Sequence, residues 1–222
     1  MALILHIDTA IDKASICLSR DGTVIDKEES ATQRGQAAWL HTTMHTMMHR
    51  NSILFSALDA IAVMIGPGSY TGLRIGLSSA KGLCYSLKIP LISLGTLEVM
   101  AAAADKLDGY QLCPMIDARR MEVYTALYTN SLEIVLPPRA MIIDSESFLS
   151  HLEKNKILFF GNGSQKVKNV ITHENAFFAE QHLSAVEMVA LAENKFQKRE
   201  FADLAYSEPL YLKDFYSSSH IL

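Results

Sequence analysis

A glycine-rich segment in the first third of the chain has the composition of an anion-binding turn. Residues 66–76 have the sequence GPGSYTGLRIG, with an apolar run over residues 60–65 before them and a helical pattern over residues 73–87 after them. A strand, a tight turn and a helix N-terminus in this order present backbone N–H groups to an anion. No Gly-Lys-Ser/Thr ends the segment, so it is not a P-loop, and its glycine spacing departs from the dinucleotide-binding fingerprint.

Charged side chains follow two other predicted strands. Asp8 and Thr9 end the apolar run over residues 3–9, and Asp117 ends a similar run that Arg119 and Arg120 follow. Carboxylates at such positions can organise Mg²⁺ or a phosphate's water, or they can simply cap turns. Strand alternation would place the two arginines on opposite faces, so we expect only one to face a cleft. The predicted cleft and anion-binding residues are Asp8, Thr9, Gly66, Pro67, Gly68, Ser69, Thr71, Gly72, Arg74, Asp117 and Arg119.

Two glycines of this segment, Gly72 and Gly76, lie four residues apart within a predicted helix. Each costs about 1 kcal/mol of helix stability relative to alanine. Close approach of a phosphate or a partner would offset that cost, and so would close packing on a neighbouring strand. The sequence leaves both interpretations open.

The elements around these residues occur twice, with an offset of 109 residues that places Asp117 opposite Asp8. Three short predicted strands, at residues 3–9, 14–19 and 23–28, begin the first half. A helix, an apolar strand and a Gly-x-Gly turn follow in both halves, at Gly66-Pro67-Gly68 and Gly161-Asn162-Gly163. This repeat predicts an α/β protein of the actin-like ATPase (ASKHA) fold, with two similar βββαβαβα domains that face a cleft.

We expect an N-terminal domain at residues 1–106 and a C-terminal domain at residues 107–222. The final helix, which a capping box over residues 184–187 begins, could pack back on the first domain. The composition, 49% hydrophobic and 20% charged, predicts a globular chain, and a net charge of −4 does not favour nucleic-acid binding by bulk charge. Cys17, Cys84 and Cys113 are expected to be buried reduced thiols, and neither a signal peptide nor a membrane span is expected.

Several motifs, in order along the chain, resemble those of the bacterial TsaB (YeaZ) family. They are Ile7-Asp8-Thr9, the glycine-rich segment, Ala80-Lys81-Gly82, residues 116–124 (IDARRMEVY) and Pro209-Leu210-Tyr211-Leu212. The resemblance implies a cytoplasmic, non-catalytic subunit of the machinery that makes threonylcarbamoyladenosine at position 37 of tRNAs reading codons that start with A. It implies the catalytic paralogue TsaD and the ATPase TsaE as partners, with tRNA bound only through the complex. No cofactor is implied for the chain itself, and ATP or ADP is expected only within the complex.

The same resemblance implies that catalytic and metal-binding residues are missing. In the catalytic paralogue, two metal-binding histidines follow the strand after the glycine-loop helix, and this sequence has Thr96 and Met100 there. Neither side chain replaces an imidazole. His41, His45 and His49 have helical spacing that could bind a metal, but no carboxylate or thiol lies beside them on that helix, so we expect no metal site.

The predicted helix over residues 36–49 contains no Lys, Arg, Asp or Glu. It is either a partner-binding helix, which we favour, or a deeply buried core helix, since an ordinary surface helix carries charge on its outer face. The expected partner interface, which would also allow a homodimer, comprises Trp39, Leu40, Met44, Met47, Met48, Leu77, Lys81 and Tyr85.

Two other functions remain as alternatives. An ATP-dependent phosphotransferase of the actin-like fold would use Asp8, Asp117 and the glycine-rich segment, although a full set of phosphate ligands is lacking. A peptidase is less favoured, because Ser69 and Thr71 have no evident general base in the sequence.

Overall fold

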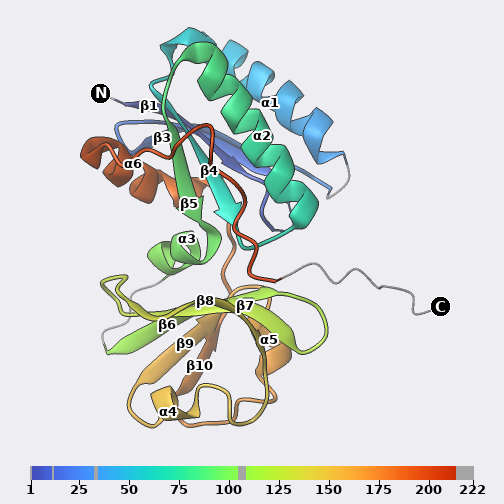
Figure 1. Cartoon of the computed structure of the whole chain (residues 1–222), viewed down its shortest axis with the longest axis vertical. Helices are drawn as coiled ribbons and strands as arrows, with labels where there is room; N and C mark the ends of the chain where they lie inside the picture. Colours follow the sequence, from blue (N-terminus) through green and yellow to red (C-terminus); the bar gives the residue numbers. More distant parts are fainter. Residues whose placement is uncertain (1, 12, 33–34, 105–108, 214–222) are drawn as a thin grey trace, which may run out of the picture.

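The computed structural model describes residues 2–11, 13–32, 35–104 and 109–213, and within them the strands form two five-stranded sheets (Figure 1). The first sheet has the order β3-β2-β1-β4-β5. Its strands are β1 (Leu3–Asp8), β2 (Ser15–Arg20), β3 (Thr23–Glu29), β4 (Ala60–Gly66) and β5 (Leu91–Gly95). The second sheet has the order β10-β9-β6-β7-β8. Its strands are β6 (Tyr110–Asp117), β7 (Glu122–Tyr128), β8 (Ile134–Ile142), β9 (Lys156–Phe160) and β10 (Ala176–Ala179).

The two sheets follow one plan. β1 pairs antiparallel with β2 and parallel with β4, and β6 pairs antiparallel with β7 and parallel with β9. β3 and β8 extend the antiparallel side, whereas β5 and β10 extend the parallel side. Asp8 and Asp117 therefore end equivalent strands, and the predicted two-domain actin-like fold is confirmed. The expected boundary between residues 106 and 107 lies outside the described residues.

The two longest helices, α1 (Gln36–Arg50) and α2 (Tyr70–Leu87), belong to the first half. The others are α3 (Thr96–Ala103), α4 (Leu149–Leu152), α5 (Ser164–Val167) and α6 (Val189–Lys198), with 3₁₀ turns η1 (Phe55–Ala57) and η2 (Ala185–Met188). The capping box forms as predicted, because Ser184 accepts from Val186 N while the Glu187 carboxylate accepts from Ser184 N at 2.7 Å. It caps η2, which leads directly into α6.

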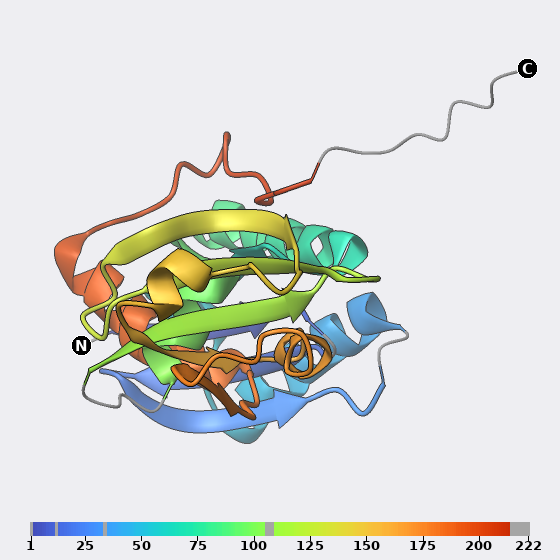
Figure 2. The ribbon, with the colours of Figure 1, turned by 90° about the horizontal axis from the view of Figure 1, so that it is seen from below.

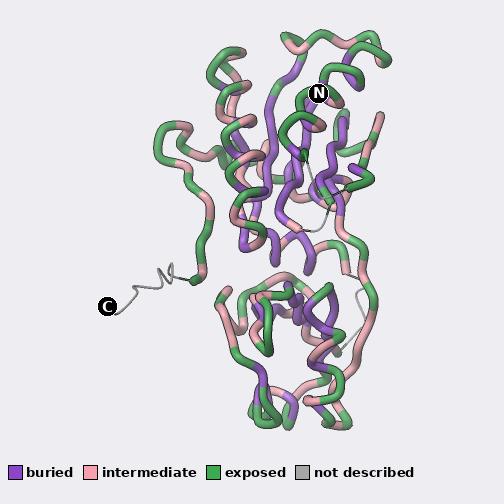
Figure 3. Tube along the Cα trace, turned by 90° about the vertical axis from the view of Figure 1, so that its right-hand side faces the viewer, coloured by how far each residue is buried: buried purple, intermediate pink, exposed green. Residues whose placement is uncertain are grey.

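Helices cover both faces of the first sheet (Figure 1). Leu5 and Ile7 of β1 pack with α1 and α2, whereas Ile4 packs with α6 on the opposite face. Alternate residues of one strand thus enter two cores, which is why β1 is continuously apolar. Figure 3 shows the resulting concentration of buried residues along these strands. The last helix, α6, thus lies on the first sheet.

One helix joins the two halves. Leu97, Met100 and Ala101 of α3 pack against Leu112 and Phe160 of the second sheet. The other face of that sheet is covered by α4 and α5, which Figure 2 shows on the side away from the first half. The α3 contacts are apolar and buried, so they fix the two halves relative to each other around the space between them.

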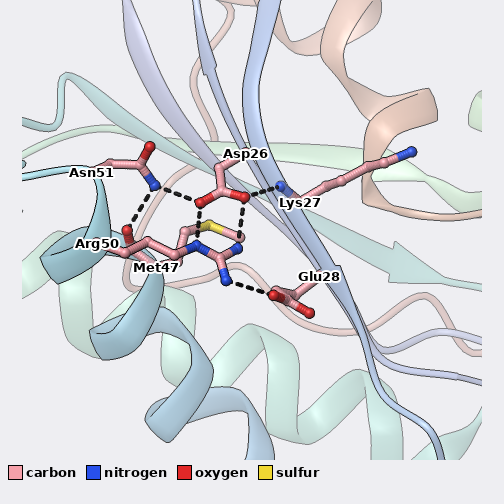
Figure 4. A network of polar contacts seen from close by, with 6 residues as sticks. All are labelled: Asp26, Lys27, Glu28, Met47, Arg50 and Asn51. Carbon is pink, nitrogen blue, oxygen red and sulfur yellow. Dashed lines mark hydrogen bonds and ion pairs between the residues drawn. The ribbon is translucent and has the colours of Figure 1, made fainter.

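The C-terminal end of α1 is held on β3 by an ion-pair network (Figure 4). Arg50 donates to both Asp26 oxygens and to Glu28, at 2.5–2.6 Å, and Asn51 Nδ2 donates to Asp26 and to the Met47 carbonyl. The hydrogen bond from Arg50 is the main cause that lowers the pKa of Asp26. The network positions α1 over the edge of the sheet, far from the space between the halves.

Residues 202–213, here called the C-terminal strap, run from α6 along the first half toward the second (Figure 1). Ala202 N donates to Leu91 O at 2.8 Å, and Leu210 N donates to Ile65 O at 2.7 Å. The Lys81 ammonium donates to the carbonyls of two strap residues, and Lys213 pairs with Glu122 of β7. The strap therefore closes one side of the space between the two sheets.

The three cysteines are free and buried, as expected. Burial raises the pKa of Cys113 to about 12, which keeps its thiol protonated and unreactive. Within the described residues, we find no helix with the length and apolar character needed to cross a bilayer.

Candidate functional site

The glycine-rich segment forms the predicted strand, turn and helix, as β4, a tight turn and α2. Some of its N–H groups, however, are already engaged within the protein. Ser69 N donates to Ala10 O at 2.6 Å, Gly72 N to the Ser69 side chain at 3.2 Å, and Leu73 N to Ser69 O at 2.8 Å. The bonds to Ser69 cap the first turn of α2, so the N–H groups of Ser69 and Gly72 are not available to an anion.

The glycines of the segment are required by close packing on the end of β1. A Cβ atom at Gly72 would lie 2.0 Å from Thr9 O, and one at Gly76 would lie 2.3 Å from Thr9 Oγ1. Thr9 in turn donates its hydroxyl to Gly72 O at 2.7 Å. Of the two interpretations that the sequence left open, the structure supports packing on the adjacent strand.

Asp8 lies away from the cleft, contrary to the prediction. Its side chain is 1% exposed, and it accepts hydrogen bonds from Ala10 N at 2.8 Å and from Ser15 at 3.5 Å. Burial raises the pKa of Asp8 to about 7, although both hydrogen bonds act in the opposite direction. Ser15 also accepts from Ala185 N at 2.8 Å, so Asp8 is part of the contact between the first sheet and η2.

Asp117 is exposed at the equivalent position of the second half. Its Oδ1 accepts from Arg119 N at 2.7 Å and from Lys166 at 2.5 Å, while its own N–H donates to Asn162. Partial burial acts to raise the pKa of Asp117, but the bond and charge of Lys166 and the N–H of Arg119 outweigh it and lower the pKa. This carboxylate is ionised and already paired with a lysine.

The structure places Arg119 and Arg120 in the turn between β6 and β7, before the strand begins at Glu122. Both have left-handed backbone conformations, with φ of 71° and 49°. The expected strand alternation is therefore wrong, and both side chains face the space between the halves. The turn is closed by hydrogen bonds from Glu122 N to Arg119 O and from Ala118 N to Glu122 O, both 3.1 Å.

A cavity of about 960 Å³ occupies this space. The turn after β6 forms one wall, the start of the glycine-rich segment another, and the strap a third. Of the predicted cleft residues, Pro67, Gly68 and Arg119 line it, whereas Asp8, Thr9 and Gly72 are buried elsewhere. Its lining is Pro67, Gly68, Tyr70, Ala118, Arg119, Arg120, Met121, Glu122, Tyr124, Ile142, Leu210, Tyr211, Leu212 and Lys213.

The remaining predicted residues do not line the cavity. Gly66 has φ of 117°, and a Cβ atom there would meet Leu210 O at 2.8 Å, so only glycine admits the strap. Ser69 and Thr71 are exposed. Arg74 is exposed too, with its guanidinium 3.8 Å from the centre of the Tyr70 ring and its Nε donating to the Tyr211 hydroxyl at 3.0 Å.

Sequence reasoning missed Arg120, Tyr70 and the strap as parts of this cavity. The one signal in the sequence was the Pro209-Leu210-Tyr211-Leu212 motif. It contributed to the family resemblance, but the sequence assigned it no place in the fold. Its contacts are with residues more than a hundred positions away, such as Arg74, and no local pattern reveals them.

The predicted interface needs correction where it relied on the apolar stripe of α1. Met44 is 2% exposed, and all members of the stripe lie in the core against the first sheet; they are Leu40, Met44, Met47 and Met48, with Leu77 of α2 beside them. These side chains cannot meet a partner. Trp39 and Lys81 are half-buried, and Tyr85 is 80% exposed. The burial of this stripe agrees with the alternative interpretation of the charge-free helix, in which its apolar side belongs to the core.

Thr96 and Met100, which the sequence resemblance set against the paralogue's metal ligands, are buried at the start and middle of α3. A thioether within an apolar core is a poor donor set for a hard or borderline metal. Among the described residues, no three His, Cys, Asp or Glu side chains converge in a way that could hold a metal ion. That includes His41, His45 and His49, which lie on the exposed side of α1.

Two repeats of one α/β plan around a shared cleft define a protein of the actin-like class. A family model described as TsaD, tRNA N6-adenosine threonylcarbamoyltransferase, matches residues 28–220. A tRNA threonylcarbamoyladenosine biosynthesis protein TsaB from Bacillus subtilis is 35% identical over 172 residues, 76% of this chain and 74% of that protein. The TsaB of Haemophilus influenzae is 25% identical over 225 residues, 95% and 93% of the two chains. The chain belongs to the TsaB (YeaZ) family.

A solved structure supports the fold independently. The crystal structure of a Pseudomonas aeruginosa protein, described as similar to the peptidase YeaZ, superposes with a TM-score of 0.83 at 24% identity. The match covers 96% of this chain and all of that one. Both halves are thus shared with that protein.

Proposed function

We propose that this chain takes part in making threonylcarbamoyladenosine at position 37 of tRNA, as a non-catalytic subunit beside a TsaD-type paralogue and a TsaE-type ATPase. The pathway follows from the family, whose members carry that role in their names. The observation that supports a non-catalytic role is the state of the actin-like site. Asp8 is buried, the N–H groups of Ser69 and Gly72 are engaged within the glycine-rich turn, and Thr96 and Met100 are buried.

The partner surface that we propose is the outer side of α1 and α2. α1 exposes only uncharged small side chains and histidines along most of its length. α2 exposes small or hydroxyl residues and one large ring, Tyr85, and its one exposed charged side chain, Arg74, lies near its start beside the cavity. A helix pair that exposes so few charges is suited to burial in a protein interface, whose centre is depleted of charge. The corrected interface residues are His41, Thr42, His45, Ser78, Gly82 and Tyr85, with Trp39 and Lys81 at its margin. The same surface could support a homodimer when the paralogue is absent.

Depletion of the chain in its source organism tests the pathway. Nucleoside mass spectrometry of bulk tRNA should show a fall in threonylcarbamoyladenosine, restored by the wild-type gene. An unchanged level after complete depletion, in a cell without a second copy, would refute the assignment. The rest of the modified-nucleoside profile serves as the internal control.

A further inference from the structure

Two arginines of the turn after β6 line the cavity, and the charge of Arg119 also helps to lower the pKa of Asp117. Both Arg119 and Arg120 are exposed and line the cavity, and within the described residues neither guanidinium takes part in a hydrogen bond or ion pair. The turn that carries them is tied by its backbone and by the Asp117 carboxylate. The guanidinium groups are therefore presented to the cavity by a fixed turn.

Aromatic rings form the opposite side of the cavity. The rings of Tyr70 and Tyr211 lie 5.3 Å apart, and Arg74 holds them together by its contact with the first and its hydrogen bond to the second. A third ring, Tyr124 of β7, lies on the same side of the cavity as the arginine turn. Tyr211 is 42% exposed, so its ring offers a flat surface that no core packing covers completely.

The charge at this cavity differs from that of the whole chain. Three cationic side chains, Arg119, Arg120 and Lys213, line it together with one carboxylate, Glu122, which pairs with Lys213. The charges of this pair cancel, so the two arginines leave the lining cationic, whereas the chain carries a net charge of −4. A local cationic site in an acidic protein indicates an anionic ligand. The volume of about 960 Å³ is large enough for one or two nucleotide units.

The neighbouring groups decide which kind of anion fits. A Mg²⁺-bound polyphosphate needs carboxylates and backbone donors, but Asp8 is buried, Asp117 is paired with Lys166, and the Ser69 and Gly72 N–H groups are engaged. A phosphodiester needs neither. Guanidinium forks bind its oxygens, and unstacked bases pack on aromatic rings.

We propose that the cavity binds one or two unpaired nucleotides of a single-stranded RNA segment, with phosphates on Arg119 and Arg120 and a base against Tyr211. The choice of RNA rests on the proposed function in tRNA modification. The chain then supplies one local RNA contact inside an assembly in which the partner supplies most of the others.

Fluorescence anisotropy with a fluorescein-labelled single-stranded RNA of eight nucleotides, titrated with the full chain at 50 and 200 mM salt, tests this site. Replacing both arginines, Arg119→Ala with Arg120→Ala, should weaken binding at least tenfold. It should also reduce the slope of log affinity against log salt by about 1.4, since each contact with a single strand contributes about 0.7. The matched control is Arg20→Ala with Arg139→Ala, which removes equal charge from exposed positions outside the cavity and should change binding less than twofold.

The aromatic contact has its own pair of variants. Tyr211→Leu should weaken binding without changing the salt slope, whereas Tyr211→Phe, which keeps the ring, should bind as the wild type does. The proposal is overturned if the wild type does not bind the RNA at millimolar protein, or if the cavity and control arginine pairs weaken it equally. It is also overturned if Mg²⁺–ATP displaces the RNA at micromolar concentration, which would assign the cavity to a free nucleotide. These outcomes are independent of the depletion experiment. That experiment measures tRNA modification in the cell and gives the same result whichever subunit contacts the RNA.

Discussion

Asp8 and Asp117 end equivalent strands of the two halves, yet their carboxylates have opposite environments. Asp8 is buried beside Ser15, with a pKa raised by burial, whereas Asp117 is exposed and paired with Lys166, with a lowered pKa. In the first half the strand end has become part of the core. In the second half it remains at the surface and supports the turn that carries Arg119 and Arg120.

The buried Asp8 predicts a pH-dependent stability. Its folded-state pKa of about 7 lies above the ordinary value of 3.8, so the folded state binds the proton more tightly than the unfolded state does. Stability should fall as pH rises from about 4 to about 7 and then level off. Relative to wild type, Asp8→Asn should gain about 2–3 kcal/mol of unfolding free energy between pH 5 and pH 8. Urea titrations at both pH values measure this, and a difference that does not change with pH would contradict the assignment.

Two glycines of α2 should respond oppositely to alanine. At Gly72 the new Cβ atom would lie 2.0 Å from the Thr9 carbonyl oxygen, so α2 must move off β1. We expect a loss of about 3 kcal/mol. Gly82 has no atom within 4 Å of the same position, and Gly82→Ala should gain up to about 1 kcal/mol from helix propensity. Thermal or urea unfolding of both variants is the measurement; equal effects would show that the packing against Thr9 is not tight.

The stripe on α1 predicts a folding defect. Met44→Asp places a carboxylate at a site that is 2% exposed, at a cost comparable to the whole stability of a domain. We expect loss of the cooperative unfolding transition and of near-ultraviolet circular dichroism. His45→Asp, one residue further and exposed, should keep both. A folded Met44→Asp protein of normal stability would restore the stripe as an accessible surface.

These results show what the sequence could and could not predict. The repeat was visible because strand patterns, turns and Asp117 recur at a fixed offset from Asp8. The sequence did not reveal whether the apolar side of α1 is buried in the core or faces a partner. Both situations require the same apolar spacing, and Met44 fits either. The cavity was only partly predictable. Its turn conformation at Arg119 and its strap contact at Tyr211 depend on tertiary contacts, which local pattern does not encode.

The exposed face of α1 and α2 predicts where a partner binds. Tyr85→Asp places a charge at the centre of that uncharged face and should weaken binding to the TsaD-type paralogue at least tenfold, since the charge would lose its hydration in the complex. Ile134→Asp, at an exposed position of β8 in the other half, is the control and should bind normally. Isothermal titration calorimetry gives both affinities. Normal affinity of a folded Tyr85→Asp protein would eliminate this face.

The central claim is that the chain is required for threonylcarbamoyl transfer without performing it. The most direct test is reconstitution from purified components, with mass spectrometry of threonylcarbamoyladenosine in unmodified tRNA supplied with the activated threonylcarbamoyl donor and ATP. We predict no product with this chain alone, and multiple-turnover product when the TsaD-type and TsaE-type partners are added together with it. Product from this chain without the paralogue, or full activity of the partners in its absence, would contradict the account.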